Sequence, residues 1–177
     1  MNLTDVFYRS NQTETVGIRL TEAEFEELAA GVRGLEDVRL KEAAEVTLSL
    51  EHTEKGKALI KGFGTMILEG ACSRCLEPVP VSLPLDFCRI VYAPEAIPDE
   101  EQKEEQQFLT EYELDAKGLI LEELCLSVPV KLLCREDCRG ICKKCGQNLN
   151  QKDCGCDDFV PDIRLAGLMD LFQNSST

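Results

Sequence analysis

The stretch ALIKGFGTMILEGACSRCLEPVPVSLPLDF, residues 58–87, holds two extended segments on either side of a Cys-x-x-Cys turn. In the second segment five apolar residues occupy alternate positions, namely Val79, Val81, Leu83, Leu85 and Phe87. Such alternation predicts a strand with one buried face, and Pro80 and Pro84, which point away from that face, predict an edge or bent strand.

Upstream of this stretch, Val46, Leu48 and Leu50 alternate in the same way before the turn EKGK at residues 54–57. A period-two pattern that is interrupted by a glycine-containing turn is typical of a β-hairpin. We therefore expect three or four antiparallel strands between residues 43 and 92.

Three short helices are expected around these strands. Thr21 opens TEAEFEELAAG with Glu24 three residues later, which is a capping-box pattern, and Gly31 is a plausible end of this helix. Residues 119–127 (LILEELCLS) have helical spacing, and Pro129 ends the pattern. Pro161 precedes a last predicted helix, IRLAGLMDLF, at residues 163–172.

The acidic segment 94–112 is predicted to be a solvated connection without packed structure. Nine acids and a single base, Lys103, lie between Glu95 and Asp115. The predicted fold class is therefore α+β: a small antiparallel β-sheet body with a few short helices and a C-terminal cysteine-rich metal-binding lobe. The predicted division is a body at 1–132, with an acidic linker at about 94–115, and a zinc lobe plus C-terminal helix at 133–177.

Length and composition bound the compartment and the partners. With 177 residues, 44% of them hydrophobic, the chain is long enough for one ordinary core. The amino terminus MNLTDVFYRS has no apolar run behind a basic start, and no stretch is long enough to cross a bilayer, so we expect a cytoplasmic protein. A net charge of −14 argues against a protein that coats nucleic acid through its overall field.

Six of the ten cysteines fall in LCREDCRGICKKCGQNLNQKDCGC, residues 133–156. In a reducing cytosol dense cysteines bind metal more often than they form disulfides. Cys142 and Cys145 with the following Gly146 have the spacing of a metal knuckle, and the one histidine, His52, is far away in the sequence. Any site here is therefore all-thiolate, and zinc in a closed tetrahedral shell is the expected cofactor.

The cysteines divide by spacing into two candidate sites of four. Cys142, Cys145, Cys154 and Cys156 are predicted to form one site, and Cys134 and Cys138 are predicted to form another with Cys72 and Cys75. Cys88 and Cys125 lie on apolar patterns and are then ordinary core residues. The alternative for Cys72 and Cys75 is a free pair at a strand turn.

The same cysteines are compatible with several chemistries other than zinc binding. Unpaired cysteines can serve as small buried apolar residues, but the neighbours of this cluster are charged. An iron–sulfur cluster is the less favoured alternative, since spacing alone does not distinguish an iron site from a zinc site. The spacing of Cys138, Cys142 and Cys145 matches radical enzymes that bind adenosylmethionine, but these need a large downstream barrel. Neither Cys-x-x-Cys pair lies in a βαβ unit, which disfavours thioredoxin-like chemistry.

Several motifs taken together resemble one protein family. They are GACSRCLEPVPV, the acidic segment, LxxEELCLSVPVKLLC and CREDCRGICKKCGQNLNQKDCGC. From about Gly70 to the last predicted helix, the chain is similar to the YceD family, the bacterial and plastid proteins of the large ribosomal RNA subunit accumulation type. The resemblance implies a cytoplasmic factor that large-subunit ribosomal RNA needs in order to accumulate, and some family members lack the cysteine-rich end.

No catalytic constellation is present, since GxSxG, GxxxxGK[ST] and HExxH are absent, and we expect a protein that is not an enzyme. Residues 134–156 hold five bases and three acids, whereas the rest of the chain is acidic. An acidic protein suits a basic ribosomal protein or the pre-ribosomal large subunit as partner, with local contact between the basic lobe and ribosomal RNA. No membrane and no small-molecule substrate is expected. The alternative function is a metal-dependent redox or metal-sensing protein, with zinc or an iron–sulfur cluster.

Overall fold

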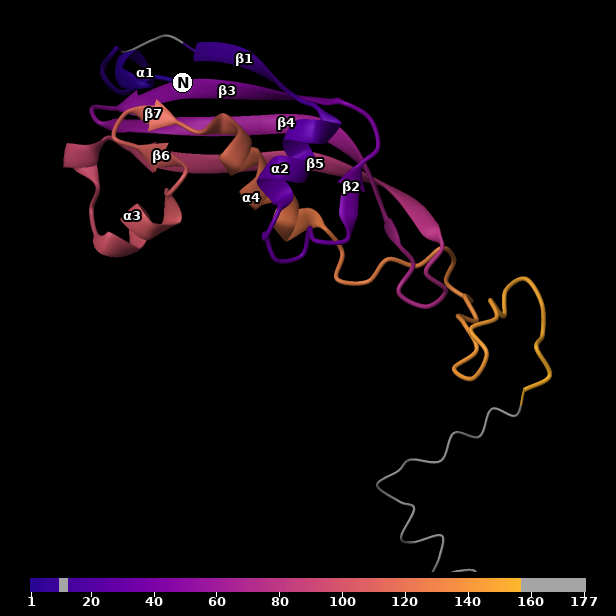
Figure 1. The fold of residues 1–177 in the computed structure, drawn as a ribbon. Coiled ribbons are helices and arrows are strands. Elements are labelled where there is room, and N and C mark those ends of the chain that lie inside the picture. Colours follow the sequence, from indigo (N-terminus) through magenta and orange to yellow (C-terminus); the bar gives the residue numbers. More distant parts are fainter. Residues whose placement is uncertain (10–12, 157–177) are drawn as a thin grey trace, which may run out of the picture.

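A five-stranded antiparallel sheet forms the body of the protein in a computed structural model that describes residues 1–9 and 13–156 (Figure 1). The strands in chain order are β1 (Thr13–Leu20), β2 (Val38–Leu40), β3 (Ala44–Glu54), β4 (Lys57–Ala71) and β5 (Pro78–Tyr92). β5 pairs with the whole length of β4 on one side, while β3 and then β2 pair with it on the other. The sheet confirms the antiparallel strands predicted between residues 43 and 92, and it adds β1 and β2 outside that range.

Short helices and a small hairpin complete the body. They are α1 (Thr4–Tyr8), α2 (Glu22–Ala29), the 3-10 helix η1 (Pro94–Ala96), α3 (Glu100–Glu105), the hairpin β6 (Leu109–Thr110) and β7 (Glu113–Leu114), and α4 (Ala116–Ser127). The predicted capping box is confirmed, because the Glu24 N–H donates to Thr21 Oγ1 while the Thr21 N–H donates to the Glu24 carboxylate. α4 begins at Ala116 rather than Leu119, since Asp115 accepts a hydrogen bond from the Gly118 N–H and caps it.

The core lies between one face of the sheet and helices α2 and α4, which lie beneath it in Figure 1. Val46, Leu48 and Leu50 point into this core from β3 and are fully buried, as the alternation predicted. Gly62 of β4 lies opposite Phe87 of β5, and a Cβ at Gly62 would come within 2.2 Å of the phenyl ring. Glycine there lets the ring lie flat across the sheet.

The other face of the sheet is open. Phe63 and Ile90, on β4 and β5, are 54% and 50% exposed on it. Cys88 lies on the same strand as Ile90 and is exposed, so its prediction as a core residue is wrong. It shares the even-numbered face of β5 with Pro84 and not the buried odd-numbered face. Cys125 of α4 is half-buried and packs against the core.

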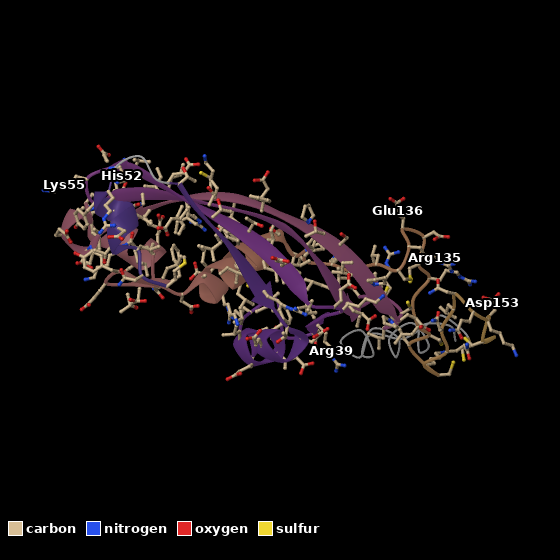
Figure 2. The ribbon with its side chains drawn as sticks, turned by 90° about the horizontal axis from the view of Figure 1, so that it is seen from above. Arg39, His52, Lys55, Arg135, Glu136 and Asp153 are labelled. Carbon is tan, nitrogen blue, oxygen red and sulfur yellow. The ribbon has the colours of Figure 1, made fainter. Side chains whose placement is uncertain are left out.

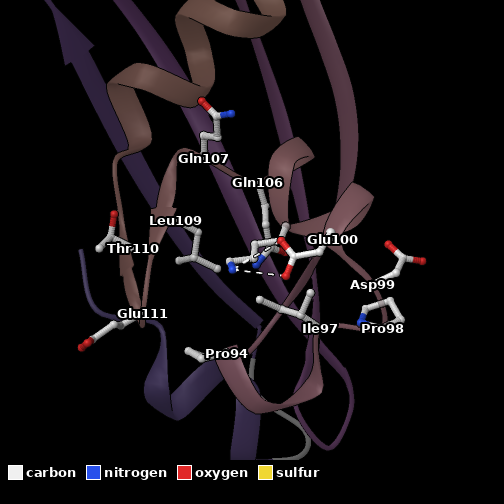
Figure 3. A pocket seen from close by; sticks show the side chains of 11 residues that line it. Pro94, Ile97, Pro98, Asp99, Glu100, Gln106, Gln107, Leu109, Thr110 and Glu111 are labelled. Carbon is white, nitrogen blue, oxygen red and sulfur yellow. Dashed lines mark hydrogen bonds and ion pairs between the residues drawn. The ribbon is translucent and has the colours of Figure 1, made fainter.

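The acidic segment is more structured than the sequence predicted. It contains η1, α3 and the β6–β7 hairpin, and the side chains of Phe108, Leu109 and Leu114 are buried in the core. Gln106 is 5% exposed; its Nε2 donates to the Tyr92 carbonyl at 3.1 Å and its Oε1 accepts from the Tyr92 N–H at 3.0 Å. Figure 3 shows Gln106 beside α3 at this end of the sheet. The segment therefore packs through its apolar residues and Gln106, while the acids of α3 stay exposed.

Two predictions are not tested by the residues that the structure describes. The last predicted helix, 163–172, lies outside them, and the division of the chain at residue 132 stays a prediction. Among the helices that are described, none combines the length and the apolar composition that crossing a membrane requires.

We expect Gln106→Ala to lower the free energy of unfolding by about 1–3 kcal/mol, because it leaves two part-buried backbone groups of Tyr92 without partners. Gln107→Ala is the matched control, since Gln107 is the exposed neighbour of the same residue type and should change stability little. Urea unfolding of both variants measures the difference. Equal midpoints for the two would show that the Gln106 amide does not hold the end of β5.

Candidate metal centres

The first thiol cluster joins two distant parts of the chain. Cys72 and Cys75 lie in the turn between β4 and β5, while Cys134 and Cys138 follow α4. All four sulfur atoms lie within 4.8 Å of one another. Cys72 Sγ lies 3.8 Å from Cys138 Sγ, and Cys75 Sγ lies 3.5 Å from Cys134 Sγ.

These distances fit a single tetrahedral ion. Because zinc–sulfur bonds are about 2.3 Å long, four thiolates around one zinc ion lie about 3.8 Å apart. The two sulfur–sulfur distances are close to this value, and both are far longer than the bond of about 2.05 Å in a disulfide. Spacing alone left open whether Cys72 and Cys75 complete a site with the other two cysteines or form a free pair. The structure brings all four together as one potential ligand set.

The second cluster consists of Cys142, Cys145, Cys154 and Cys156, whose sulfur atoms also lie within 4.8 Å of one another. Cys142 is buried, Cys145 is exposed, and the other two are half-buried. This grouping is the one predicted from the spacing. That these eight cysteines bind metal stays a prediction.

Each cluster begins with the same backbone turn. In the first, the Leu76 N–H donates to the Cys72 carbonyl at 2.9 Å, and the Cys72 N–H donates to the Glu77 carbonyl at 2.8 Å. In the second, Gly146 and Cys142 donate to the carbonyls of Cys142 and Gln147 at the same two distances, 2.9 and 2.8 Å. Leu76 and Gly146 both have left-handed backbone angles, with φ of 62° and 74°. Cys-Ser-Arg-Cys therefore has the same backbone turn as Cys142–Cys145, with leucine where the second turn has glycine.

The knuckle turns point backbone N–H groups at sulfur and favour thiolates there. Burial raises the pKa of the Cys72 thiol, but N–H groups of Cys75, Arg74 and Cys134 donate to its sulfur and bring the pKa down to about 6. The N–H groups of Cys145 and Lys144 likewise lower the pKa of Cys142 to about 6. Cys72 in the first cluster and Cys142 in the second are thus readily ionised near neutral pH.

One other thiol of each cluster behaves in the opposite way. Burial, followed by the neighbouring thiols of Cys138 and Cys75, raises the pKa of Cys134 to about 12. The neighbouring thiols of Cys145 and Cys154 raise the pKa of Cys156 to about 12. Four thiolates at this spacing repel one another, so complete ionisation of either cluster requires a cation between the sulfurs.

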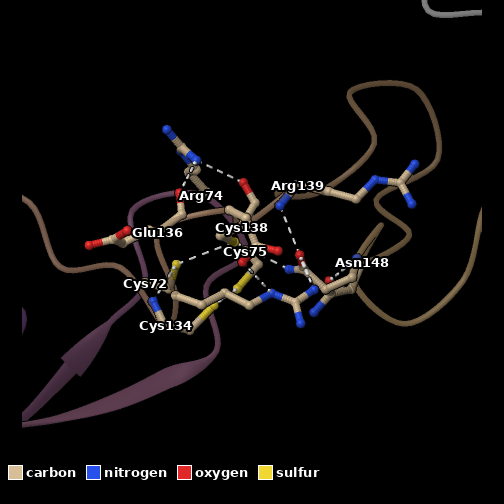
Figure 4. A network of polar contacts seen from close by, with 11 residues as sticks. Cys72, Arg74, Cys75, Cys134, Glu136, Cys138, Arg139 and Asn148 are labelled. Atoms are coloured by element: carbon tan, nitrogen blue, oxygen red, sulfur yellow. Dashed lines mark hydrogen bonds and ion pairs between the residues drawn. The ribbon is translucent and has the colours of Figure 1, made fainter.

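Polar side chains that the sequence analysis missed support the first cluster (Figure 4). Asn150 Nδ2 donates to Cys138 Sγ at 3.2 Å, while its Oδ1 accepts from the Arg139 N–H and from Arg135 Nη2, each at 2.8 Å. Arg74 Nη1 donates to the carbonyl oxygen of Cys138 at 2.9 Å. Asn150 gave no signal in the sequence, because one asparagine in a polar loop is ordinary.

The two clusters are built against each other. The Ile141 N–H donates to the Arg74 carbonyl at 3.1 Å, and Glu77 Oε1 accepts from Asn148 Nδ2 at 3.0 Å and from Gln151 Nε2 at 2.9 Å. The first knuckle therefore supports the loop of the second. His52, the one histidine, lies at the opposite end of the sheet, where its Nδ1 is 3.0 Å from the Val6 carbonyl (Figure 2).

Comparison with known proteins places this geometry in a family context. The family model described as "Large ribosomal RNA subunit accumulation protein YceD" matches residues 61–172. Uncharacterized proteins of Mycobacterium tuberculosis and Mycobacterium bovis are 28% identical over 116 residues. The match covers 64% of this chain and 56% of each relative, so the chain spans little more than half of their length. No solved structure matches.

We expect two metal ions per chain, and one in a variant carrying both Cys72→Ser and Cys75→Ser, because each cluster supplies a complete four-thiolate shell. Elemental analysis of protein purified without added metal gives the stoichiometry. The matched control carries Cys88→Ser and Cys125→Ser, which lie outside both clusters and should leave two ions bound. A single ion that the first variant retains would remove Cys72 and Cys75 from the ligand set.

We expect Leu76→Gly to stabilise the first knuckle by about 1 kcal/mol, because a left-handed backbone costs leucine roughly 1–2 kcal/mol that glycine does not pay. The reciprocal change, Gly146→Leu, should weaken the second knuckle by a similar amount. Competition with a chelator, followed as metal release, measures both effects. If Leu76→Gly released metal more readily than the parent, the strain at Leu76 would not be what limits this turn.

Proposed function

The chain belongs to the family of the large ribosomal RNA subunit accumulation protein YceD, and on this premise we propose that it is a non-enzymatic factor that acts by contact with a ribosomal protein or the pre-ribosomal large subunit. Family membership, carried by the match over residues 61–172, indicates a role in ribosomal RNA accumulation. The relatives named above are uncharacterized, so the choice of partner is argued from this chain's own charges.

The charges are separated along the molecule, which supports two kinds of contact. The acids of α3 are exposed at the end of the body away from the cysteine lobe (Figure 1). Lys143, Lys144 and Lys152 of the lobe form no ion pair with any described residue. We assign the acidic end to a basic ribosomal protein and these lysines to RNA phosphates.

We propose zinc as the ion in both clusters. Four thiolates within 4.8 Å fit the shell of one tetrahedral ion, whereas an iron–sulfur cluster distributes its cysteines over two or more irons and holds them farther apart. A shell of four protein ligands has no open position for a substrate or water. The ions therefore serve the structure of the lobe, which agrees with a factor that is not an enzyme.

One observation favours the redox or metal-sensing alternative. Cys134 and Cys145, one in each cluster, are exposed and open to oxidants. Zinc release on oxidation is expected for either function, so thiol reactivity does not separate them. Co-sedimentation with immature large ribosomal subunits separates the two functions, because an assembly factor should bind these subunits and a redox or metal sensor should not.

The contribution of each charged end can be tested by complementation. We expect Glu100, Glu101, Glu104 and Glu105 changed together to Gln to reduce ribosomal RNA levels in a deletion strain, because the salt-screened attraction to a basic partner is lost. Stability should be unchanged, since these α3 side chains are exposed.

The companion variant changes Lys143, Lys144 and Lys152 to Gln and spares Arg135 and Arg139, which bind Asn150 and Asp153 within the lobe. Quantifying large-subunit ribosomal RNA in both strains decides the assignment. If the variant without the α3 glutamates restored ribosomal RNA fully and the variant without the three lysines did not, the main contact would lie in the lobe and the proposed role of α3 would be wrong.

A further inference from the structure

The last residue of β5, Tyr92, shows which backbone N–H and C=O groups of the strand point to its free edge. The N–H and C=O of Tyr92 both bind the Gln106 side chain, so they point away from β4. Backbone groups alternate in direction along a strand, so the even-numbered residues of β5 all direct theirs toward this edge. They are Pro78, Pro80, Ser82, Pro84, Asp86, Cys88, Ile90 and Tyr92.

Most of this edge is blocked against another strand. Three of the outward positions are prolines, which have no N–H to donate, and they cover the end of β5 next to the cysteine lobe. The Gln106 amide occupies the groups of Tyr92 at the other end. Between these two blocks the outward N–H and C=O groups of Asp86, Cys88 and Ile90 have no hydrogen-bond partner among residues 1–9 and 13–156.

The gap has apolar side chains on the open face of the sheet and acids on both faces. On the open face, Ile90 pairs with Leu59, Phe63 pairs with Asp86, and Lys61, which binds Glu51, pairs with Cys88. Ile90 and Phe63 are both about half exposed. On the opposite face α4 packs against β5 and presents the exposed Glu122, next to Glu123, which forms an ion pair with Arg89. Asp86 and Glu122 have no cationic partner among the described residues.

We propose that Asp86–Ile90 is a docking site for an extended basic segment of a partner protein, which adds to the sheet beside β5. Successive side chains of an added strand point to opposite faces. Apolar side chains of the segment would then meet Ile90 and Phe63, while its lysines and arginines would meet Glu122 and the other acids. The inference deepens the proposed function by specifying how a basic partner binds, and it rests on that function only for the partner's class.

The probe is a capped seven-residue peptide of alternating valine and lysine, and its control alternates valine and glutamate. Binding to the full chain is measured by fluorescence anisotropy. We expect Cys88→Pro to weaken binding of the lysine peptide about tenfold or more, because proline removes an outward N–H and obstructs the added strand. Ser82→Pro is the matched control: it also places proline at an outward position, but between two prolines that already block the edge.

Hydrogen exchange of the parent chain tests the same site without a substitution. In the free chain the amides of Asp86, Cys88 and Ile90 should exchange fast, while those of Phe87 and Arg89, which face β4, should be protected. The lysine peptide should slow exchange at the three outward amides. If these amides were already protected in the free chain, another part of the chain or a second copy would occupy the edge, and the proposal would be wrong.

Three further results would contradict the proposed docking site. Absence of binding by the lysine peptide, equal weakening by Cys88→Pro and Ser82→Pro, or equal binding of the glutamate peptide would each overturn the docking site. None of these results bears on whether the chain supports ribosomal RNA accumulation, which the deletion strain reports separately. A Cys88→Pro chain that binds normally and restores ribosomal RNA would therefore leave the proposed function intact and reject only the edge.

Discussion

The gathering of Cys72 and Cys75 with Cys134 and Cys138 is the constraint on which the carboxyl-terminal lobe depends. These pairs join positions 66 and 59 residues apart, and among residues 1–9 and 13–156 only Val79 and Leu133 pack beside them as apolar neighbours. Closing loops of this length costs entropy that so small an apolar cluster does not offset. An ion bound by four thiolates can supply the missing free energy, because metal binding and local folding are then one process.

The second centre is arranged as a continuation of the first. Its knuckle is positioned by the bond from the Ile141 N–H to the Arg74 carbonyl, and Gly140 lets the chain pass close to Arg74, since a Cβ there would lie 2.9 Å from that carbonyl. Glu77 holds the side chains of Asn148 and Gln151. Loss of the first centre is therefore expected to release the second from the body, whereas loss of the second leaves the first supported by the β4–β5 turn.

Sequence reasoning succeeded where one local pattern fixed the outcome. Alternating apolar residues located β3 and β5, Thr21 with Glu24 located α2, and cysteine spacing predicted the two sets of thiols that lie close together. It did not detect that Cys72–Leu76 has the same turn as Cys142–Gly146, because a left-handed leucine, Leu76, stands where the glycine signal would be. It missed the packing of the acidic segment because Gln106 acts through tertiary contact with Tyr92, and its sequence neighbours are acids and other glutamines. Composition reports average solvation and does not identify the residues that turn inward.

β5 connects these features, and its position gives the free edge a physical meaning. The strand starts directly after the first knuckle and ends where Gln106 binds Tyr92, so it is fixed at both ends while β4 pairs with its whole length. A strand fixed in this way offers the outward groups of Asp86, Cys88 and Ile90 in a set geometry before any partner arrives. This chain would then lose little conformational entropy on binding. Most of the entropy cost would come from ordering the extended segment of the partner. The candidate metal centre at the start of β5 and the glutamine at its end would thus bear on the proposed binding without touching the partner, because they hold the edge between them in place.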